Sequence, residues 1–121
     1  MIKGTGIDIE ETDRIRESVK SKSFRERIFL PEETAYALSR PDPALHFAAR
    51  FCAKEAFAKA CGSPQLWLEV CVVNDDKGAP SFALTGKAAE LTKGCRVHLS
   101  LTHSKKYAAA VVVIEETNET G

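Results

Sequence analysis

No run of apolar residues in this 121-residue sequence approaches the roughly 20 positions needed to cross a membrane. The first residues, 1–6, lack the pattern of a signal peptide. The four cysteines form no C-x-x-C pair, and no histidine stands at zinc-finger spacing. We therefore expect a cytoplasmic protein in which Cys52, Cys61 and Cys71, which stand among apolar neighbours, are small buried thiols.

A net charge is also absent. Seventeen lysine and arginine residues balance seventeen aspartate and glutamate residues, so the overall charge gives no case for nucleic-acid binding. Repeats and linkers are missing too, and we expect a single domain over residues 1–116 followed by a polar tail, 117–121. Residues 14–27 nevertheless contain six basic and two acidic side chains. Such a segment can steer an acidic partner, although a solvated helix face is the simpler interpretation of charge alone.

Residues 46–60 form the segment around which we expect the chain to fold. Alanine, lysine, glutamate and phenylalanine fill it without glycine or proline, which predicts a helix that Gly62 ends. Phe51, Glu55 and Lys59 share one face at four-residue spacing. The simpler interpretation of the two charges is an exposed ion pair, worth about 0.3–0.5 kcal/mol. The alternative is a partly buried carboxylate that binds a metal ion or a proton, with a lysine one turn away to meet an anion.

Alternation predicts a short strand over residues 2–10, with two isoleucines on one face and Gly4, Gly6, Asp8 and Glu10 on the other. The two glycines leave room for something to approach the backbone closely. An aspartate between isoleucines is poorly suited to a strand. A functional role for Asp8 therefore stands beside the alternative that it caps the following helix.

The remaining pattern places helices early and strands late. Besides the central helix, we expect helices at 13–23, from Pro31 to before Pro41, and at 85–93, and strands at 66–73, 80–84, 96–102 and 107–114, with a turn at 74–78. This order predicts an α+β fold in which an antiparallel sheet packs against the long central helix.

Residues 98–107 form a second informative segment between two predicted strands. His103, Ser104, Lys105 and Lys106 place imidazole, hydroxyl and ammonium donors in one loop, and such donors suit a phosphate. An ordinary polar hairpin loop explains the same residues equally well.

Four short segments carry a further signal. They are Gly6-Ile7-Asp8-Ile9-Glu10 with Arg14-Ile15 after it, Arg50-Phe51-x-Ala53-Lys54-Glu55-Ala56-Phe57-x-Lys59-Ala60, Asn74-Asp75-x-x-Gly78-x-Pro80, and Ser100-Leu101-Thr102-His103-Ser104-Lys105-x-Tyr107-Ala108-Ala109. In this order and at these spacings they resemble the holo-acyl-carrier-protein synthase family, the small class of 4'-phosphopantetheinyl transferases. The resemblance covers about residues 1–116.

The resemblance implies a reaction of fatty acid biosynthesis: coenzyme A gives its 4'-phosphopantetheine arm to a serine of apo-acyl carrier protein and releases adenosine 3',5'-bisphosphate. Asp8 and Glu55 match the family's metal-binding carboxylates, and an all-oxygen shell suits Mg²⁺. Lys59 matches a lysine beside the phosphates, where it would stabilise the transition state. Glu55, directly or through a metal-bound water, is the candidate base for the serine hydroxyl.

Other positions match the family's coenzyme site. Arg50, His103 and Ser104 match positions near the adenosine phosphates, and Gly78 and Pro80 match the turn that lies against the adenine.

The resemblance also implies protein partners. Arg14 and Arg27 match positions that meet the acidic carrier protein, which would account for the basic excess in residues 14–27. Members of the family are typically homotrimers with active sites at subunit interfaces.

The sequence departs from the family after the central helix. A glycine-rich segment is usual there, whereas only residues 63–66 separate Gly62 from Trp67. Lys77 and Ala79 stand where asparagine and lysine are common. The shortened loop motivates an alternative function, a non-catalytic module that binds acyl carrier protein on the same fold.

Overall fold

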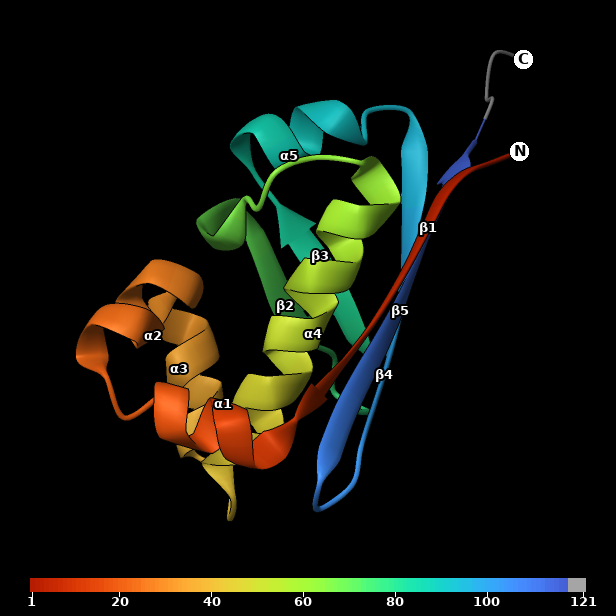
Figure 1. Ribbon diagram of the computed structural model, residues 1–121. Coiled ribbons are helices and arrows are strands. Elements are labelled where there is room, and N and C mark those ends of the chain that lie inside the picture. The colour runs from red at the N-terminus through yellow and green to blue at the C-terminus, as the bar shows by residue number, and fades with distance from the viewer. Residues whose placement is uncertain (118–121) are drawn as a thin grey trace.

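A computed structural model gives the structure of the protein and describes residues 1–117 (Figure 1). The elements in chain order are β1 (Ile2–Glu11), α1 (Thr12–Ser18), α2 (Lys22–Ile28), α3 (Pro31–Leu38), α4 (Pro43–Cys61), a 3-10 turn η1 (Trp67–Glu69), β2 (Val70–Asn74), β3 (Pro80–Leu84), α5 (Gly86–Leu91), β4 (Cys95–His103) and β5 (Tyr107–Glu116). Of the expected tail 117–121, residues 118–121 lie outside the described part of the chain.

A three-stranded antiparallel sheet, in the order β1-β5-β4, forms one layer of the molecule. The long helix α4 crosses one face of this sheet, while the hairpin of β2 and β3 lies beside the helix (Figure 1). The rings of Phe57 on α4 and Phe82 on β3 meet edge to face, 5.4 Å between centroids, and join the hairpin to the helix. The predicted α+β fold is confirmed.

Two glycines set how closely β1 and α4 approach. A Cβ atom at Gly4 or Gly6 would collide with the backbone carbonyl oxygens of Ala60 and Ala56, respectively. The segment predicted to approach the glycine face of β1 is therefore α4 itself. This contact brings the side chains that alternate with the glycines against the helix.

The central helix is longer than predicted and starts at Pro43 rather than residue 46. Proline is favourable there because the first helical N–H has no partner within the helix. Gly62 ends the helix in the left-handed conformation, with φ of +64°, as the sequence predicts.

The single helix predicted at 13–23 is wrong. The chain forms two short helices, α1 and α2, with a turn at residues 19–21. Ser21 caps α2, because its hydroxyl accepts a hydrogen bond from the N–H of Phe24 at 3.2 Å. The helical spacing of apolar residues continues through this turn, so periodicity alone does not reveal that the helix is interrupted.

The strand predicted at 66–73 is wrong in its first half, where η1 precedes β2. The predicted helix at 85–93 is the shorter α5, and the strand at 96–102 is the longer β4. The turn at 74–78 is confirmed: the Asp75 carboxylate accepts hydrogen bonds from the backbone of Lys77 and Ala79, and Gly78 has φ of +87°.

The core lies where α4 meets the sheet and the α2–α3 segment. All four cysteines are free thiols; Cys52 and Cys71 are buried as expected, while Cys61 is only partly buried. Among the described residues, the helices include none with the length and apolar character that a membrane span requires.

Candidate functional site

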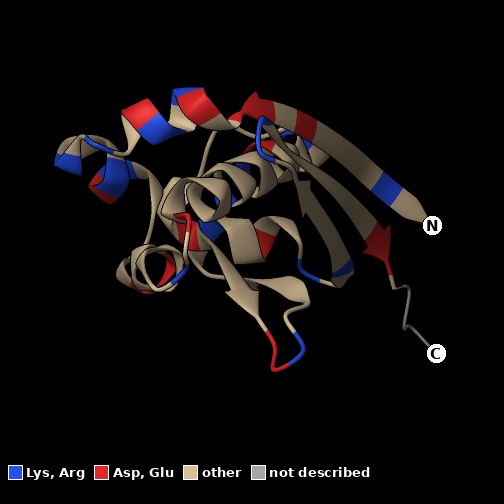
Figure 2. Ribbon diagram, turned by 90° about the horizontal axis from the view of Figure 1, so that it is seen from below, with Lys and Arg blue, Asp and Glu red and all other residues tan. Residues whose placement is uncertain are grey.

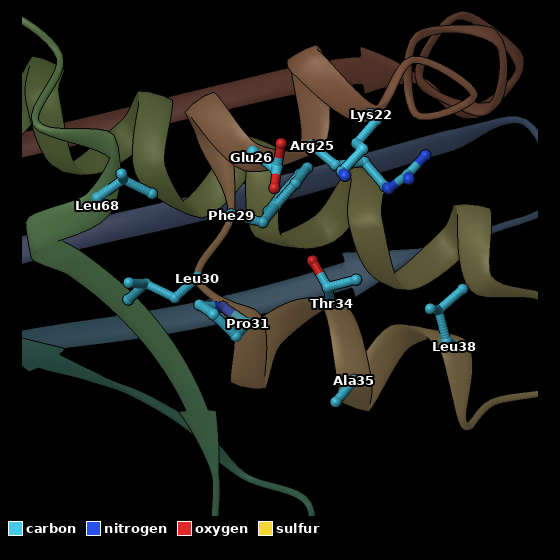
Figure 3. Close-up of a pocket in the computed structure, with 10 residues that line it drawn as sticks. All are labelled: Lys22, Arg25, Glu26, Phe29, Leu30, Pro31, Thr34, Ala35, Leu38 and Leu68. Atoms are coloured by element: carbon cyan, nitrogen blue, oxygen red, sulfur yellow. The ribbon is translucent and has the colours of Figure 1, made fainter.

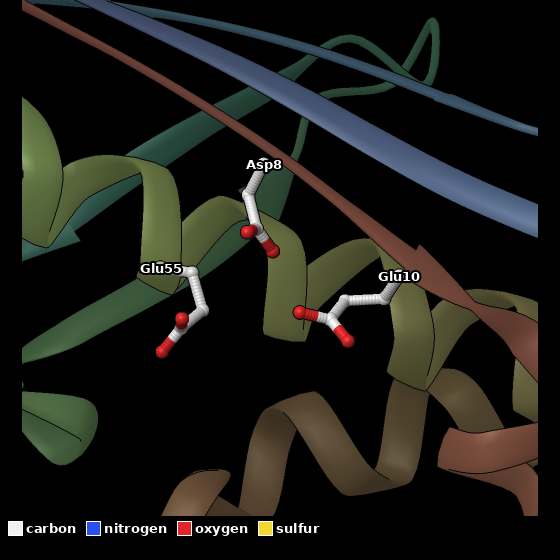
Figure 4. A group of neighbouring side chains, drawn as sticks. All are labelled: Asp8, Glu10 and Glu55. Carbon is white, nitrogen blue, oxygen red and sulfur yellow. The ribbon is translucent and has the colours of Figure 1, made fainter.

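Three carboxylates converge between β1 and α4 (Figure 4). Asp8 and Glu10 are two residues apart on β1, so both project from the glycine face toward the helix, where Glu55 meets them. One oxygen from each of the three groups lies within 4.8 Å of the others. The sequence-predicted pair Asp8 and Glu55 is thus brought together, with Glu10 as a third member.

Burial and mutual repulsion make the charged forms of these carboxylates unfavourable in the protein alone. Burial raises the pKa of Glu10, and hydrogen bonding with Asp8 and then the negative charge of Asp8 raise it further. Burial and the Asp8 charge likewise raise the pKa of Glu55. Asp8 is only 9% exposed, and its Oδ2 is a buried acceptor without a donor among the described residues. Such crowded oxygens fit a hard divalent cation, for which they are the preferred ligands.

Among the described residues, each carboxylate contacts one side-chain donor. Lys59 Nζ lies 3.2 Å from Asp8 Oδ1 and also donates to the carbonyl of Ile7. Arg14 contacts Glu10 at 2.6 Å.

The third donor is the amide of Gln65, which contacts Glu55 at 2.5 Å. The exposed Glu55–Lys59 ion pair considered above does not form in the described structure, because Lys59 pairs with Asp8. Glu55 is therefore the partly buried carboxylate of the alternative interpretation.

A separate cavity of about 180 Å³ gathers most of the residues expected at a nucleotide. Arg50, Gly78, Pro80 and His103 all line it, although they come from α4, the β2–β3 hairpin and β4. Ser104 is not part of this lining; its hydroxyl accepts hydrogen bonds from the N–H groups of Lys106 and Tyr107 in the β4–β5 turn.

Arg50 is the buried cation of this cavity, with only 2% of its surface exposed. It donates to the side-chain oxygen of Asn74 at 2.7 Å and lies over the ring of Tyr36, 4.2 Å from its centroid. Its Nε is buried without an acceptor among the described residues. Burial lowers the pKa of Arg50. A buried guanidinium with an unused donor is suited to an anionic ligand.

Two imidazoles lie side by side at the same cavity. The rings of His46 and His103 meet edge to face with 5.5 Å between centroids. Burial lowers the pKa of His46, and the neighbouring His103 and Arg50 lower it further. An anion between these groups would relieve their mutual repulsion.

The two arginines expected at a partner face have different environments. Arg14 is tied to Glu10, whereas Arg27 is exposed on α2, 6.0 Å from the ring of Phe24, and forms no ion pair among the described residues. In Figure 2, blue basic positions and red acidic positions alternate along the ribbon of the helices that follow β1.

A largely apolar groove of about 540 Å³ runs between α2 and α3 (Figure 3). Phe29, Leu30 and Leu38 line it, and Lys22 and Arg25 stand at the α2 side. The groove is distinct from the carboxylate cluster and from the Arg50 cavity.

Several residues of these sites were missed in the sequence. Glu10 could have been found, because it shares the strand face of Asp8 at the two-residue period. His46 stands one helical turn before Arg50 and could have been found in the same way. Gln65 gave no signal, since its contact with Glu55 depends on the path of the loop after α4.

The fold and these sites define a class of protein. The family model of the 4'-phosphopantetheinyl transferase superfamily matches residues 4–112 of the chain. Within that superfamily, the chain belongs to the holo-[acyl-carrier-protein] synthase family, as its relatives establish.

A holo-[acyl-carrier-protein] synthase of Treponema denticola is 46% identical over 122 residues, which cover 95% of this chain and 99% of that protein. The enzyme of that name from Anaeromyxobacter sp. (strain K) is 43% identical over 127 residues, covering 97% and 98% of the two chains. The crystal structure of a holo-(acyl-carrier-protein) synthase from Bacillus anthracis in complex with CoA (3',5'-ADP) superposes with a TM-score of 0.82, at 36% identity, over 97% of this chain and 99% of that one.

Proposed function

We propose that the protein transfers 4'-phosphopantetheine from coenzyme A to a serine of apo-acyl carrier protein, as a cytoplasmic step of fatty acid biosynthesis, with residues 1–116 acting as one domain. The observation that carries this proposal is the convergence of Asp8, Glu10 and Glu55 on one point. In the reaction the serine oxygen forms a bond to the pantetheine-side phosphorus. The bond from that phosphorus to the bridging oxygen breaks, and adenosine 3',5'-bisphosphate leaves.

Asp8 and Glu55, joined by Glu10, would hold a Mg²⁺ ion, since the buried Asp8 Oδ2, which has no donor within the described chain, fits a metal ligand. When bound, Mg²⁺ neutralises charge on the pyrophosphate and orients it. Glu55, directly or through a water, accepts the proton of the serine hydroxyl. Lys59, whose ammonium already lies beside Asp8, offers positive charge to the phosphate oxygens as the leaving group departs.

The Arg50 cavity is the proposed site of the adenosine part of coenzyme A. Arg50 and His103 would contact its phosphates, with Ser104 in the adjoining turn, and Gly78 and Pro80 would lie against the adenine. The unused Nε of Arg50 and the crowded imidazoles support an anionic ligand there.

The surface of α1 and α2, with Arg14 and Arg27, is the proposed docking face for the carrier protein. Charge complementarity supports an acidic partner, because Lys22 and Arg27 are exposed on α2. The neighbouring apolar groove between α2 and α3 offers room for an apolar side chain of that partner (Figure 3).

We further propose a homotrimer with active sites between subunits. Arg50 and Glu55 are five residues apart on α4, about 140° around the helix axis at 3.6 residues per turn, so the nucleotide cavity and the carboxylate cluster lie on opposite flanks. A second subunit that brings its own cavity to the cluster would complete the site. The outer face of the sheet supports such a contact, since Ile7 and Ile9 are 68% and 64% exposed there.

Mass spectrometry tests the proposed activity. The protein is incubated with apo-acyl carrier protein, coenzyme A and Mg²⁺, and the carrier is weighed. The carrier should gain the mass of one phosphopantetheine, and a chelator should abolish the gain. Carrier binding without coenzyme binding or mass gain would instead favour the non-catalytic module that the shortened loop suggests.

A further inference from the structure

The connection between α4 and η1 brings a neutral amide to the carboxylate cluster. Gly62 turns the chain at the end of α4, and the N–H of Ser63 donates to the carbonyl of Ala58 at 3.1 Å. The chain then runs back along the helix, and Gln65 Nε2 donates to Glu55 Oε1 at 2.5 Å. A residue ten positions after Glu55 thus contacts the middle of the helix.

The three donors around the cluster differ in charge. Lys59 and Arg14, the donors to Asp8 and Glu10, are cations, whereas the donor to Glu55 is uncharged. A cation reduces the net charge that a carboxylate offers to a metal ion. An amide fixes the orientation of the carboxylate and leaves its charge intact.

The amide of Gln65 also carries an unused acceptor. Its Oε1 is buried and has no donor among the described residues, as is true of Asp8 Oδ2. Buried polar atoms are nearly always partnered, and two of the four exceptions among the described residues belong to side chains at the cluster. A hydrated cation at the cluster would satisfy both acceptors. Asp8 Oδ2 would bind the metal ion, and Gln65 Oε1 would accept a hydrogen bond from a water of its hydration shell.

We propose that Gln65 is a positioning residue that holds the Glu55 carboxylate for metal binding through its Nε2–H. This inference rests on the proposed function, in which Glu55 is a metal ligand. Hydrogen-bond partners of metal ligands contribute about 10–100-fold to metal affinity. Loss of the Gln65 donor should therefore weaken metal binding within that range.

Binding of Mn²⁺ to the full chain, followed by the electron paramagnetic resonance signal of free Mn²⁺, tests the proposal without any transfer reaction. Gln65→Met keeps the length of the side chain and removes the donor, and Gln65→Ala removes both. Ser63→Ala is the matched control in the same loop, because among residues 1–117 the Ser63 hydroxyl donates only to the carbonyl of Pro64. Glu55→Gln is the reference for a lost ligand.

We expect Ser63→Ala to bind Mn²⁺ like the unmodified protein, and both Gln65 variants to bind about 10–100-fold more weakly. Wild-type affinity in Gln65→Met would overturn the positioning role, since packing alone would then suffice. If the unmodified protein and Glu55→Gln bound Mn²⁺ with equal affinity, the metal site of the proposed function would be overturned instead. A transfer assay adds a second readout: high Mg²⁺ should restore turnover in Gln65→Met, whereas a folding defect would not respond to Mg²⁺.

Discussion

Lys54 and Glu33 form a fully buried ion pair, with 2.6 Å between Nζ and Oε1 and about 1% of either residue exposed. The ammonium also donates to the carbonyls of Ile28 and Trp67, at 2.8 Å each. The other carboxylate oxygen, Glu33 Oε2, accepts the N–H of Val72 at 2.8 Å. This network ties α4 to α3, to the end of α2, to η1 and to β2, on the flank of the helix away from the sheet.

Lys54→Met should lower the free energy of unfolding by about 3–5 kcal/mol, because it leaves the Glu33 carboxylate buried without its counter-ion. Urea unfolding followed by circular dichroism measures the change. Lys93→Met, at an exposed lysine after α5, is the control and should cost less than about 0.5 kcal/mol. A loss below about 1 kcal/mol for Lys54→Met would contradict the importance of the pair.

The sequence does not distinguish Lys54 from its neighbours. Lys54, Glu55 and Lys59 are charged residues of one alanine-rich helix, and their spacing fixes only their relative directions. Which direction is buried depends on where α3 and η1 pack, which is decided by contacts far apart in the chain. Glu55 was predicted through resemblance to known sequences, whereas the Lys54–Glu33 pair was not predicted at all.

The fold itself was more predictable because its main signals are local. Alternation identified β1 and β4, and the uninterrupted apolar helix pattern identified α4. The break between α1 and α2 was missed, since residues 19–21 contain neither glycine nor proline. The contact of Gln65 with Glu55 was also missed, because a loop path has no periodicity.

Gly6→Ala should lower the free energy of unfolding by about 1–3 kcal/mol. The new methyl group would collide with the Ala56 carbonyl and push β1 away from α4. Asp8 would then move away from Glu55, so Mn²⁺ affinity should fall as well. Urea unfolding and metal titration measure the two effects. Ser81→Ala, at an exposed position on β3, should change neither. Unchanged stability in Gly6→Ala would show that the close approach is not required.

Glu55→Gln should reduce phosphopantetheine transfer at least about 100-fold, because the variant loses both the proposed metal ligand and the candidate base. The thermal unfolding midpoint should stay near that of the unmodified protein, since the charge of Glu55 is already unfavourable beside Asp8. Transfer is measured by the mass of the carrier protein over time. Glu90→Gln, an exposed glutamate on α5, is the control. Full activity in Glu55→Gln would remove this residue from the mechanism.

Arg27→Glu should raise KM for the carrier protein roughly tenfold with little effect on KM for coenzyme A, because it reverses a charge on the proposed docking face. Arg14→Glu should also weaken carrier binding more than coenzyme binding. It is the less specific test, however, since Arg14 contacts Glu10 of the carboxylate cluster. Steady-state kinetics against each substrate separate the effects. Lys87→Glu on α5 makes the same charge change at an exposed, remote position and should leave both constants unchanged. An equal rise in both KM values for Arg27→Glu would contradict the docking assignment.

Ile9→Lys should convert the proposed trimer to a smaller species. Ile9 is 64% exposed on the outer face of the sheet, beside the exposed Ile7 and opposite Ala109 of β5. An ammonium in the centre of an apolar interface would be desolvated without a partner, which strongly disfavours association. Light scattering after size-exclusion chromatography should give three times the 13.2 kDa chain mass for the unmodified protein and less for the variant.

Leu38→Lys makes the same substitution at a similarly exposed leucine on α3, at 62% exposure and away from the sheet face, and should remain trimeric. Because the Arg50 cavity, the proposed nucleotide site, and the carboxylate cluster lie on opposite flanks of α4, the dissociated Ile9 variant should also lose transfer activity while retaining Mn²⁺ binding at its intact cluster. A monomeric unmodified protein with full activity would show that one chain completes the site alone.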